Sequence, residues 1–153
     1  MSKEHESADL ILKLYDLRRE AVMRQARDWY FTFSPETLEE VVAAARGEKS
    51  AYFRMVVSYW DMACSLVNNG AIDEQMFADA NGEQNYVFAK IQPFIAQMRE
   101  LSKQPHYLAN LEKYVMRQPD AAQRMESLRA FAKQMNAQRA AAAGQPREEA
   151  ASA

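Results

Sequence analysis

The sequence predicts an all-α fold, a multi-helix bundle of about six or seven helices in a single domain. Three observations support this fold class. Apolar residues recur at helical spacing along most of the chain. Gly and Pro, with 4 and 5 residues, are too few for the many turns of an all-β fold. A chain of 153 residues can also bury a sizeable core without a disulfide or a metal.

The first predicted helix runs from Ser7 to Phe33. Its apolar face is formed by Leu10, Ile11, Leu14, Tyr15, Leu17, Ala21, Val22, Ala26, Trp29 and Phe33. Ser34 and Pro35 then have the chemistry of an N-cap and a first helical residue, which predicts a second helix. Gly47 is expected to end that helix in the left-handed conformation.

The third predicted helix, from Lys49 to Asn69, is apolar over more than half of its circumference. A helix of this kind has neighbours on several sides, so we expect it at the centre of the bundle. Gly70 ends it. Asp73 is then the expected N-cap of a short helix that stops at Asn81.

The predicted helix over residues 83–103 carries Pro93 on its solvent face, which predicts a kink toward the core and not a break. A shorter helix begins at Pro105 and ends at Pro119. Asp120 with Gln123 has the spacing of a capping box for a last helix through Arg139. We therefore expect one helical domain over residues 1–139 and a disordered, low-complexity tail over residues 140–153.

Composition and charge bound the class of protein. The net charge of −2 and pI of about 5.8 argue against a nucleic-acid binder. No apolar run approaches the ~20 residues of a membrane-spanning helix, and the first thirty residues hold no signal-peptide core. Cys64 is the only cysteine, which favours a reducing compartment. We expect a cytoplasmic protein.

The segments Tyr59-Trp60, Val67–Glu74 and Ile91–Ile95, followed by Arg99, resemble a family of uncharacterised bacterial helical domains. The members share a G-x-I-D-E turn between core helices, here from Gly70 to Glu74. The resemblance covers about a third of the chain. It implies the helical fold and brings no assigned activity.

Metal and nucleophile patterns are weak. A di-iron bundle needs Glu-x-x-His on its helices, and neither His5 nor His106 has an acid three residues before it. Cys64 lies within an apolar helix, where a thiol is usually inert packing, although proximity to His106 in space stays open. We expect no metal and no cofactor.

Arg18 and Gln25 are polar residues within the apolar face of the first predicted helix. One interpretation is that the Arg18 stem reaches solvent from the edge of the stripe. The other is a buried polar cluster in which Asp61 is a candidate partner.

Three functions remain open from the sequence. The leading hypothesis is a non-enzymatic helical module for protein–protein interaction or self-association, with a homo-oligomer or a helical protein as its partner. The alternative is a small-molecule or lipid-binding bundle, with an apolar pocket lined by Trp60, Met62, Phe88, Phe94 and Met98. The third is an enzyme in which Asp61 and Asp73 converge, and an approach of Asp61 to Arg99 or His106 in a cleft would favour it.

Overall fold

The computed structural model describes residues 2–145, which are helical with no strand in that range. The elements are α1 (Lys3–Leu17), α2 (Ala21–Thr32), α3 (Leu38–Arg46), α4 (Ser50–Asn68), α5 (Glu74–Ala80), α6 (Glu83–Ile91), the 3₁₀ turn η1 (Gln92–Phe94), α7 (Ile95–Ser102), α8 (Ala109–Met116) and α9 (Ala121–Ala143). Within those residues, no helix is both long enough and apolar enough to cross a membrane.

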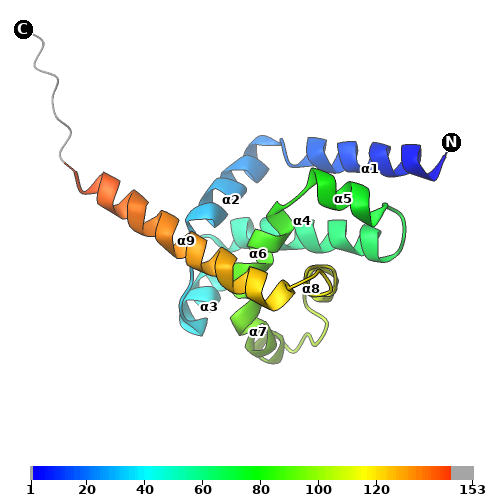
Figure 1. Cartoon of the computed structure of the whole chain (residues 1–153). Helices are drawn as coiled ribbons and strands as arrows, with labels where there is room; N and C mark the ends of the chain where they lie inside the picture. The colour runs from blue at the N-terminus through cyan, green and yellow to red at the C-terminus, as the bar shows by residue number, and fades with distance from the viewer. Residues whose placement is uncertain (1, 146–153) are drawn as a thin grey trace, which may run out of the picture.

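The central helix is α4, as predicted from its wide apolar surface. It packs against α2, α3, α5, α6 and α8. In Figure 1, α1 runs along one edge of the molecule, while α9 crosses α6 and then projects from the opposite side. One contiguous core links these helices, from Leu14 of α1 to Met125 of α9, with Trp60 of α4 inside it. The bundle is therefore built around α4.

The first predicted helix is two helices, α1 and α2. The helix is interrupted before Ala21, and Glu20 is the N-cap of α2. The Glu20 carboxylate accepts hydrogen bonds from the backbone N–H groups of Val22 and Met23 at 3.1 and 2.9 Å. These two bonds satisfy N–H groups that α2 leaves free at its first turn. The break lets α1 pack on α5 while α2 packs on α4. Glutamate is not among the usual N-cap residues, so the sequence pattern did not reveal the break.

The helix predicted over residues 83–103 is also divided. Pro93 is exposed as expected, but the chain takes a 3₁₀ turn there, and α6 and α7 are separate helices. Proline lacks the N–H that would continue the α-helical bonding, which explains the change of helix type. The two divisions account for nine α-helices within residues 2–145, in place of the six or seven expected.

Several predicted caps differ from the observed ones. Thr37, and not Ser34, caps α3 by accepting a hydrogen bond from Glu40 N–H. Gly47 is extended, with φ −91° and ψ −155°, and not left-handed. Asp120 makes no side-chain cap and is itself left-handed at φ 55°. Each position is a loop residue whose backbone angles depend on how the flanking helices pack, which local spacing does not encode.

Other local predictions are confirmed. The helix α4 ends at Asn68, just before Gly70, and Asp73 caps α5 by accepting a hydrogen bond from Met76 N–H at 2.9 Å. The predicted end of the last helix at Arg139 is wrong, because α9 continues to Ala143 and the first residues of the predicted tail are helical. The remainder of that tail from residue 146 lies outside the described residues.

Candidate functional site

Arg18, Gln25 and Asp61 do not form one buried cluster. Arg18 is half-buried, with its guanidinium carbon 5.2 Å from the Tyr15 ring centroid and 5.4 Å from that of Trp60. Gln25 is exposed and accepts a hydrogen bond from the Tyr52 hydroxyl. The break between α1 and α2 explains the separation, because residues on either side of it no longer share one helix face.

Asp61 has a structural role at the start of α8. Its carboxylate accepts hydrogen bonds from Leu111 N–H at 2.9 Å and from the Asn110 side-chain amide at 3.3 Å. The residue before α8, Leu108, is left-handed at φ 55° and makes no side-chain cap. Asp61 of α4 thus caps α8 from a distant part of the chain.

The residues of the predicted apolar pocket lie apart. Trp60 and Phe88 are fully buried in the core. Met62, Phe94 and Met98 line three different surface hollows. The structure therefore does not bring the five side chains together around one cavity.

The acids considered for catalysis occupy separate places. Asp73 is the α5 N-cap, while Asp61 lies beside His106 on an open hollow of about 510 Å³. Among the described residues, no hydrogen bond or ion pair joins Asp61 to His106. Arg99 lies elsewhere, donating to Tyr107 O and to the Glu112 carboxylate. A shared hollow without a proton path between the two groups defines no general acid–base pair.

Neither thiol nor metal chemistry gains support from the geometry. Cys64 is fully buried, and burial raises the pKa of its thiol, with the charge of Asp61 acting in the same direction. A thiol of this kind is a poor nucleophile. Over residues 2–145 there is no group of three or more His, Cys, Asp or Glu side chains that could hold a metal ion.

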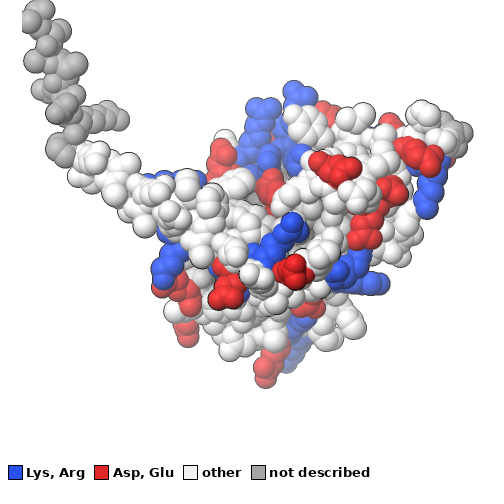
Figure 2. Space-filling model, viewed as in Figure 1, with Lys and Arg blue, Asp and Glu red and all other residues white. Residues whose placement is uncertain are grey.

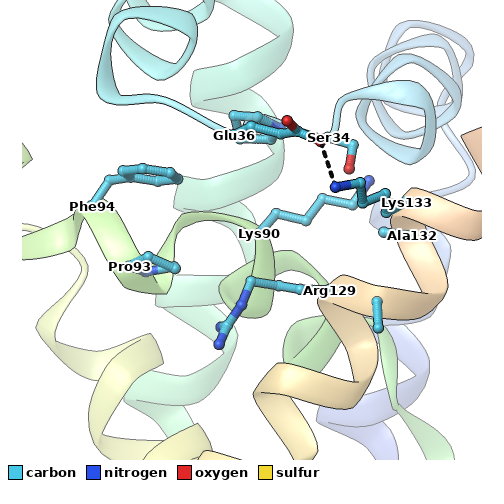
Figure 3. A pocket seen from close by; sticks show the side chains of 10 residues that line it. Ser34, Glu36, Lys90, Pro93, Phe94, Arg129, Ala132 and Lys133 are labelled. Atoms are coloured by element: carbon cyan, nitrogen blue, oxygen red, sulfur yellow. Dashed lines mark ion pairs between the residues drawn. The ribbon is translucent and has the colours of Figure 1, made fainter.

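Sequence reasoning missed Lys90, the most unusual charged side chain of the described chain. It is 2% exposed and lines a hollow of about 450 Å³ with Ser34, Pro93 and Phe94. Figure 3 shows side chains entering this hollow from α6, α9 and the segment before α3. A lysine within the buried run Val87–Ile91 is the signal that could have identified it.

The Lys90 ammonium is bound by backbone oxygens and aromatic rings. It donates to Tyr30 O at 2.6 Å and Phe31 O at 3.1 Å, and it lies 4.5 Å from the Tyr86 ring centroid. Burial, followed by the nearby charge of Arg139, lowers the pKa of Lys90 to about 7. Lys90 therefore binds carbonyl oxygens of the last turn of α2, one of which, Tyr30 O, also accepts a hydrogen bond from Phe33 N–H.

The other cations of this hollow also have partners. Arg129 donates to Ala89 O and to the Gln92 side-chain oxygen, at 3.2 and 2.7 Å. Lys133 forms an ion pair with Glu36 at 3.1 Å (Figure 3). Because each cation is already bound, the Lys90 hollow acts chemically as a junction that holds α2, α6 and α9 together.

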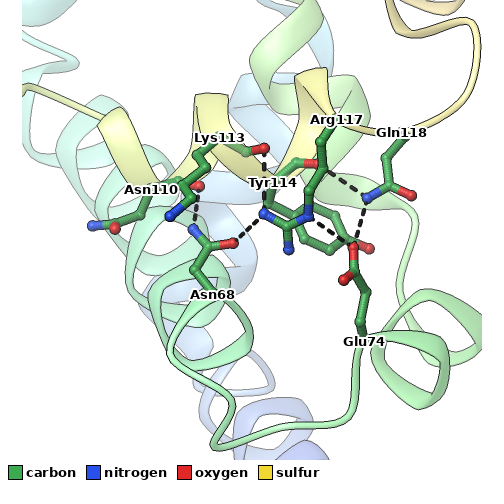
Figure 4. A network of polar contacts seen from close by, with 7 residues as sticks. All are labelled: Asn68, Glu74, Asn110, Lys113, Tyr114, Arg117 and Gln118. Carbon is green, nitrogen blue, oxygen red and sulfur yellow. Dashed lines mark hydrogen bonds and ion pairs between the residues drawn. The ribbon is translucent and has the colours of Figure 1, made fainter.

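A second polar junction joins α4, α5 and α8 around Arg117 (Figure 4). Its guanidinium donates to the Glu74 carboxylate at 3.0 Å and to the Asn68 side-chain oxygen at 2.6 Å. The ion pair with Arg117 lowers the pKa of Glu74 through its hydrogen bond. Both groups are partly exposed, so this network positions helices and adds little stability by charge alone.

One hollow is distinguished by its exposed apolar lining. It measures about 660 Å³ and lies where the α1–α2 junction meets α4. We call it the methionine hollow; Leu17, Met23, Met55, Tyr59 and Met62 form its apolar lining. Asp16, Glu20 and Ser58 form its polar edge. Leu17 is 58% exposed and Met62 is 43% exposed.

The chain belongs to a family of helical domains of unknown function. The family model, described as Domain of unknown function (DUF4760), matches residues 5–118. This range spans α1 to α8 and leaves α9 outside the match. Among curated proteins and among solved structures, no match was found.

Proposed function

We propose that this chain is a non-enzymatic helical module that self-associates through the methionine hollow. The observation that carries the proposal is that two large exposed side chains, Leu17 and Met62, line the same hollow. Single exposed apolar residues are ordinary, whereas a contiguous apolar surface with a polar edge is typical of an interface. Methionine side chains adapt to irregular partner surfaces, which suits this lining.

The proposed partner is a second copy of the chain. A two-fold symmetric dimer places the same patch of each copy against the other, so one apolar patch is sufficient for it. In such a dimer Leu17 of one copy would bury its side chain against the methionines of the other. The carboxylates of Asp16 and Glu20 would remain at the solvated rim, where charge is commonly found.

The proposal is tested by the mass of the purified protein in solution. We expect a concentration-dependent dimer by sedimentation velocity, and we expect Leu17→Glu and Met62→Glu to convert it to monomer. Phe131→Glu is the matched control, because Phe131 is 52% exposed on α9 and lines none of the hollows described above. A wild-type protein that stays monomeric at high concentration would overturn the proposal.

A small-molecule-binding bundle is the second candidate. The Lys90 hollow favours it, because Pro93 and Phe94 place apolar surface beside the hydroxyl of Ser34 in a volume of about 450 Å³. Ligand sites combine apolar walls with a few polar groups in this way. Native and denaturing mass spectrometry separate the two functions. Doubled mass without extra components supports self-association, and bound mass lost on denaturation supports the ligand site.

A further inference from the structure

Four arginine side chains surround a hollow between the α1–α2 junction and the start of α6. Arg18, Arg19, Arg24 and Arg27 line it, and its volume is about 550 Å³. We call it the arginine hollow. Figure 2 shows Lys and Arg side chains gathered over the α1–α2 junction, with acidic side chains beside them. The volume is within the range of small-molecule sites.

The arginine hollow holds an excess of positive charge. Its lining contains the carboxylates of Asp28 and Glu83 against the four guanidinium groups. Arg19 also forms an ion pair at 4.0 Å with Asp16, which lies outside the lining. Glu83 is already paired with Arg27, which donates to its carboxylate from Nε at 3.0 Å and from Nη2 at 2.8 Å. Arg18 and Arg24 have no carboxylate within 4.0 Å among the described residues. Like charges held together repel, and a bound anion would relieve that repulsion.

Two of the guanidinium groups are held in place before any ligand arrives. Arg18 lies over the rings of Tyr15 and Trp60, at 5.2 and 5.4 Å. Arg27 is held by Glu83 and also donates to Arg18 O at 3.4 Å. Stacking occupies the face of a guanidinium and leaves its N–H edge available for a ligand. Little side-chain freedom would be lost on binding at these two groups.

We propose that the arginine hollow binds a phosphate group carried by a small molecule or a lipid headgroup. Arg18 and Arg24, the two lining arginines without an ion pair among the described residues, can meet the charge of a phosphate monoester, which is close to −2 at neutral pH. The fork of N–H donors on arginine fits phosphate oxygens in pairs. The arginines surround one hollow and do not form an extended track, so the geometry suits a single phosphate and not a nucleic-acid backbone. This site is separate from the proposed self-association and does not depend on it.

The first test measures binding of inorganic phosphate and of glycerol 3-phosphate by isothermal titration calorimetry, at constant ionic strength. We expect saturable binding by the wild-type protein. Arg24→Gln should weaken it about tenfold, the effect of a lost charge-assisted contact. Because Arg24 is exposed and forms no ion pair in the described chain, this variant should fold normally. Arg18→Gln should weaken binding as well.

The matched control is Arg54→Gln. Arg54 is exposed on α4, donates a hydrogen bond to Ser50 O, and lies outside the arginine hollow. Its substitution should leave phosphate affinity unchanged. The absence of saturable binding by the wild type would overturn the proposal, and so would equal loss in the Arg24→Gln and Arg54→Gln variants.

Vesicle co-sedimentation identifies the source of the phosphate. Vesicles of phosphatidylcholine with phosphatidic acid are compared with vesicles of phosphatidylcholine alone. Arg24-dependent retention on the phosphatidic acid vesicles assigns the site to a lipid headgroup. Binding of glycerol 3-phosphate without vesicle retention assigns it to a soluble phosphorylated molecule. Either result supports the proposal, and failure of both probes overturns it.

Discussion

Lys90 is a charged side chain enclosed by the helices that it connects. Its pKa of about 7 lies below the usual 10.5, because burial disfavours the ammonium. Between these two values the unfolded chain binds more protons than the folded chain, so stability rises with pH across that window. Below about pH 7 both states hold the proton, and the full cost of burying the charge is present.

The pH dependence of stability tests this account of Lys90. From about pH 7 to pH 9 we expect the free energy of unfolding to rise by up to about 1.4 kcal/mol per pH unit. The Lys90→Met variant should lack this rise. Urea denaturation at each pH provides the measurement. Tyr30 and Tyr86, whose pKa values burial raises, act in the opposite sense only at higher pH. Parallel profiles for the two proteins would contradict the prediction.

Gly47 and Gly82 differ in the space that a side chain would have at each position. A Cβ at Gly47 would lie 2.4 Å from Ala43 O, a backbone atom that cannot easily move. A Cβ at Gly82 would meet nothing within 4 Å. We therefore expect Gly47→Ala to lower the free energy of unfolding by about 1–3 kcal/mol, and Gly82→Ala to change it by less than about 0.5 kcal/mol. Equal melting temperatures for the two variants would show that the close approach at Gly47 has no cost.

At the scale of elements, two helix ends are bound by side chains distant in sequence. The C-terminus of α2 receives donors from α6 and α9, including the Asn136 side-chain amide bonded to Thr32 O. The start of α8 receives the Asp61 carboxylate from α4. Each of these contacts satisfies a backbone group at the end of one helix with a side chain from another helix. Each therefore also helps to fix the angle between the two helices.

Asp61 allows this role to be measured. We expect Asp61→Ala to reduce the free energy of unfolding by about 1–2 kcal/mol, because Leu111 N–H loses its acceptor. Asp61→Asn should lose less, since an amide oxygen can still accept that hydrogen bond. Chemical denaturation gives the values. Asp79→Ala on α5 is the control, because Asp79 is exposed and should stay within about 0.5 kcal/mol.

At the scale of the molecule, a single core predicts a single unfolding transition. Buried side chains connect α1, through α4, to α9. Urea unfolding followed by tryptophan fluorescence and by far-UV circular dichroism should therefore give the same midpoint. Trp60 reports on the core, while circular dichroism reports on all helices. Separate midpoints would show that part of the bundle unfolds independently.

The molecule exposes two different surfaces around the α1–α2 junction. The methionine hollow is apolar and the arginine hollow is cationic, and both depend on the break at Glu20. Had residues 7–33 formed one straight helix, α2 would continue along the axis of α1. The bend instead turns α2 toward α4 and opens a hollow on each side of the junction.

The sequence by itself determined the helical class, the central place of α4, the end of α4 before Gly70 and the cap at Asp73. Each depends on apolar spacing or on the chemistry of a single turn, which nearby residues contain in full. Only the tertiary structure decided the break at Glu20, the partners of Asp61 and the burial of Lys90. Those features arise where segments far apart in the chain meet, so the energy that selects them belongs to contacts between helices and not to any one segment.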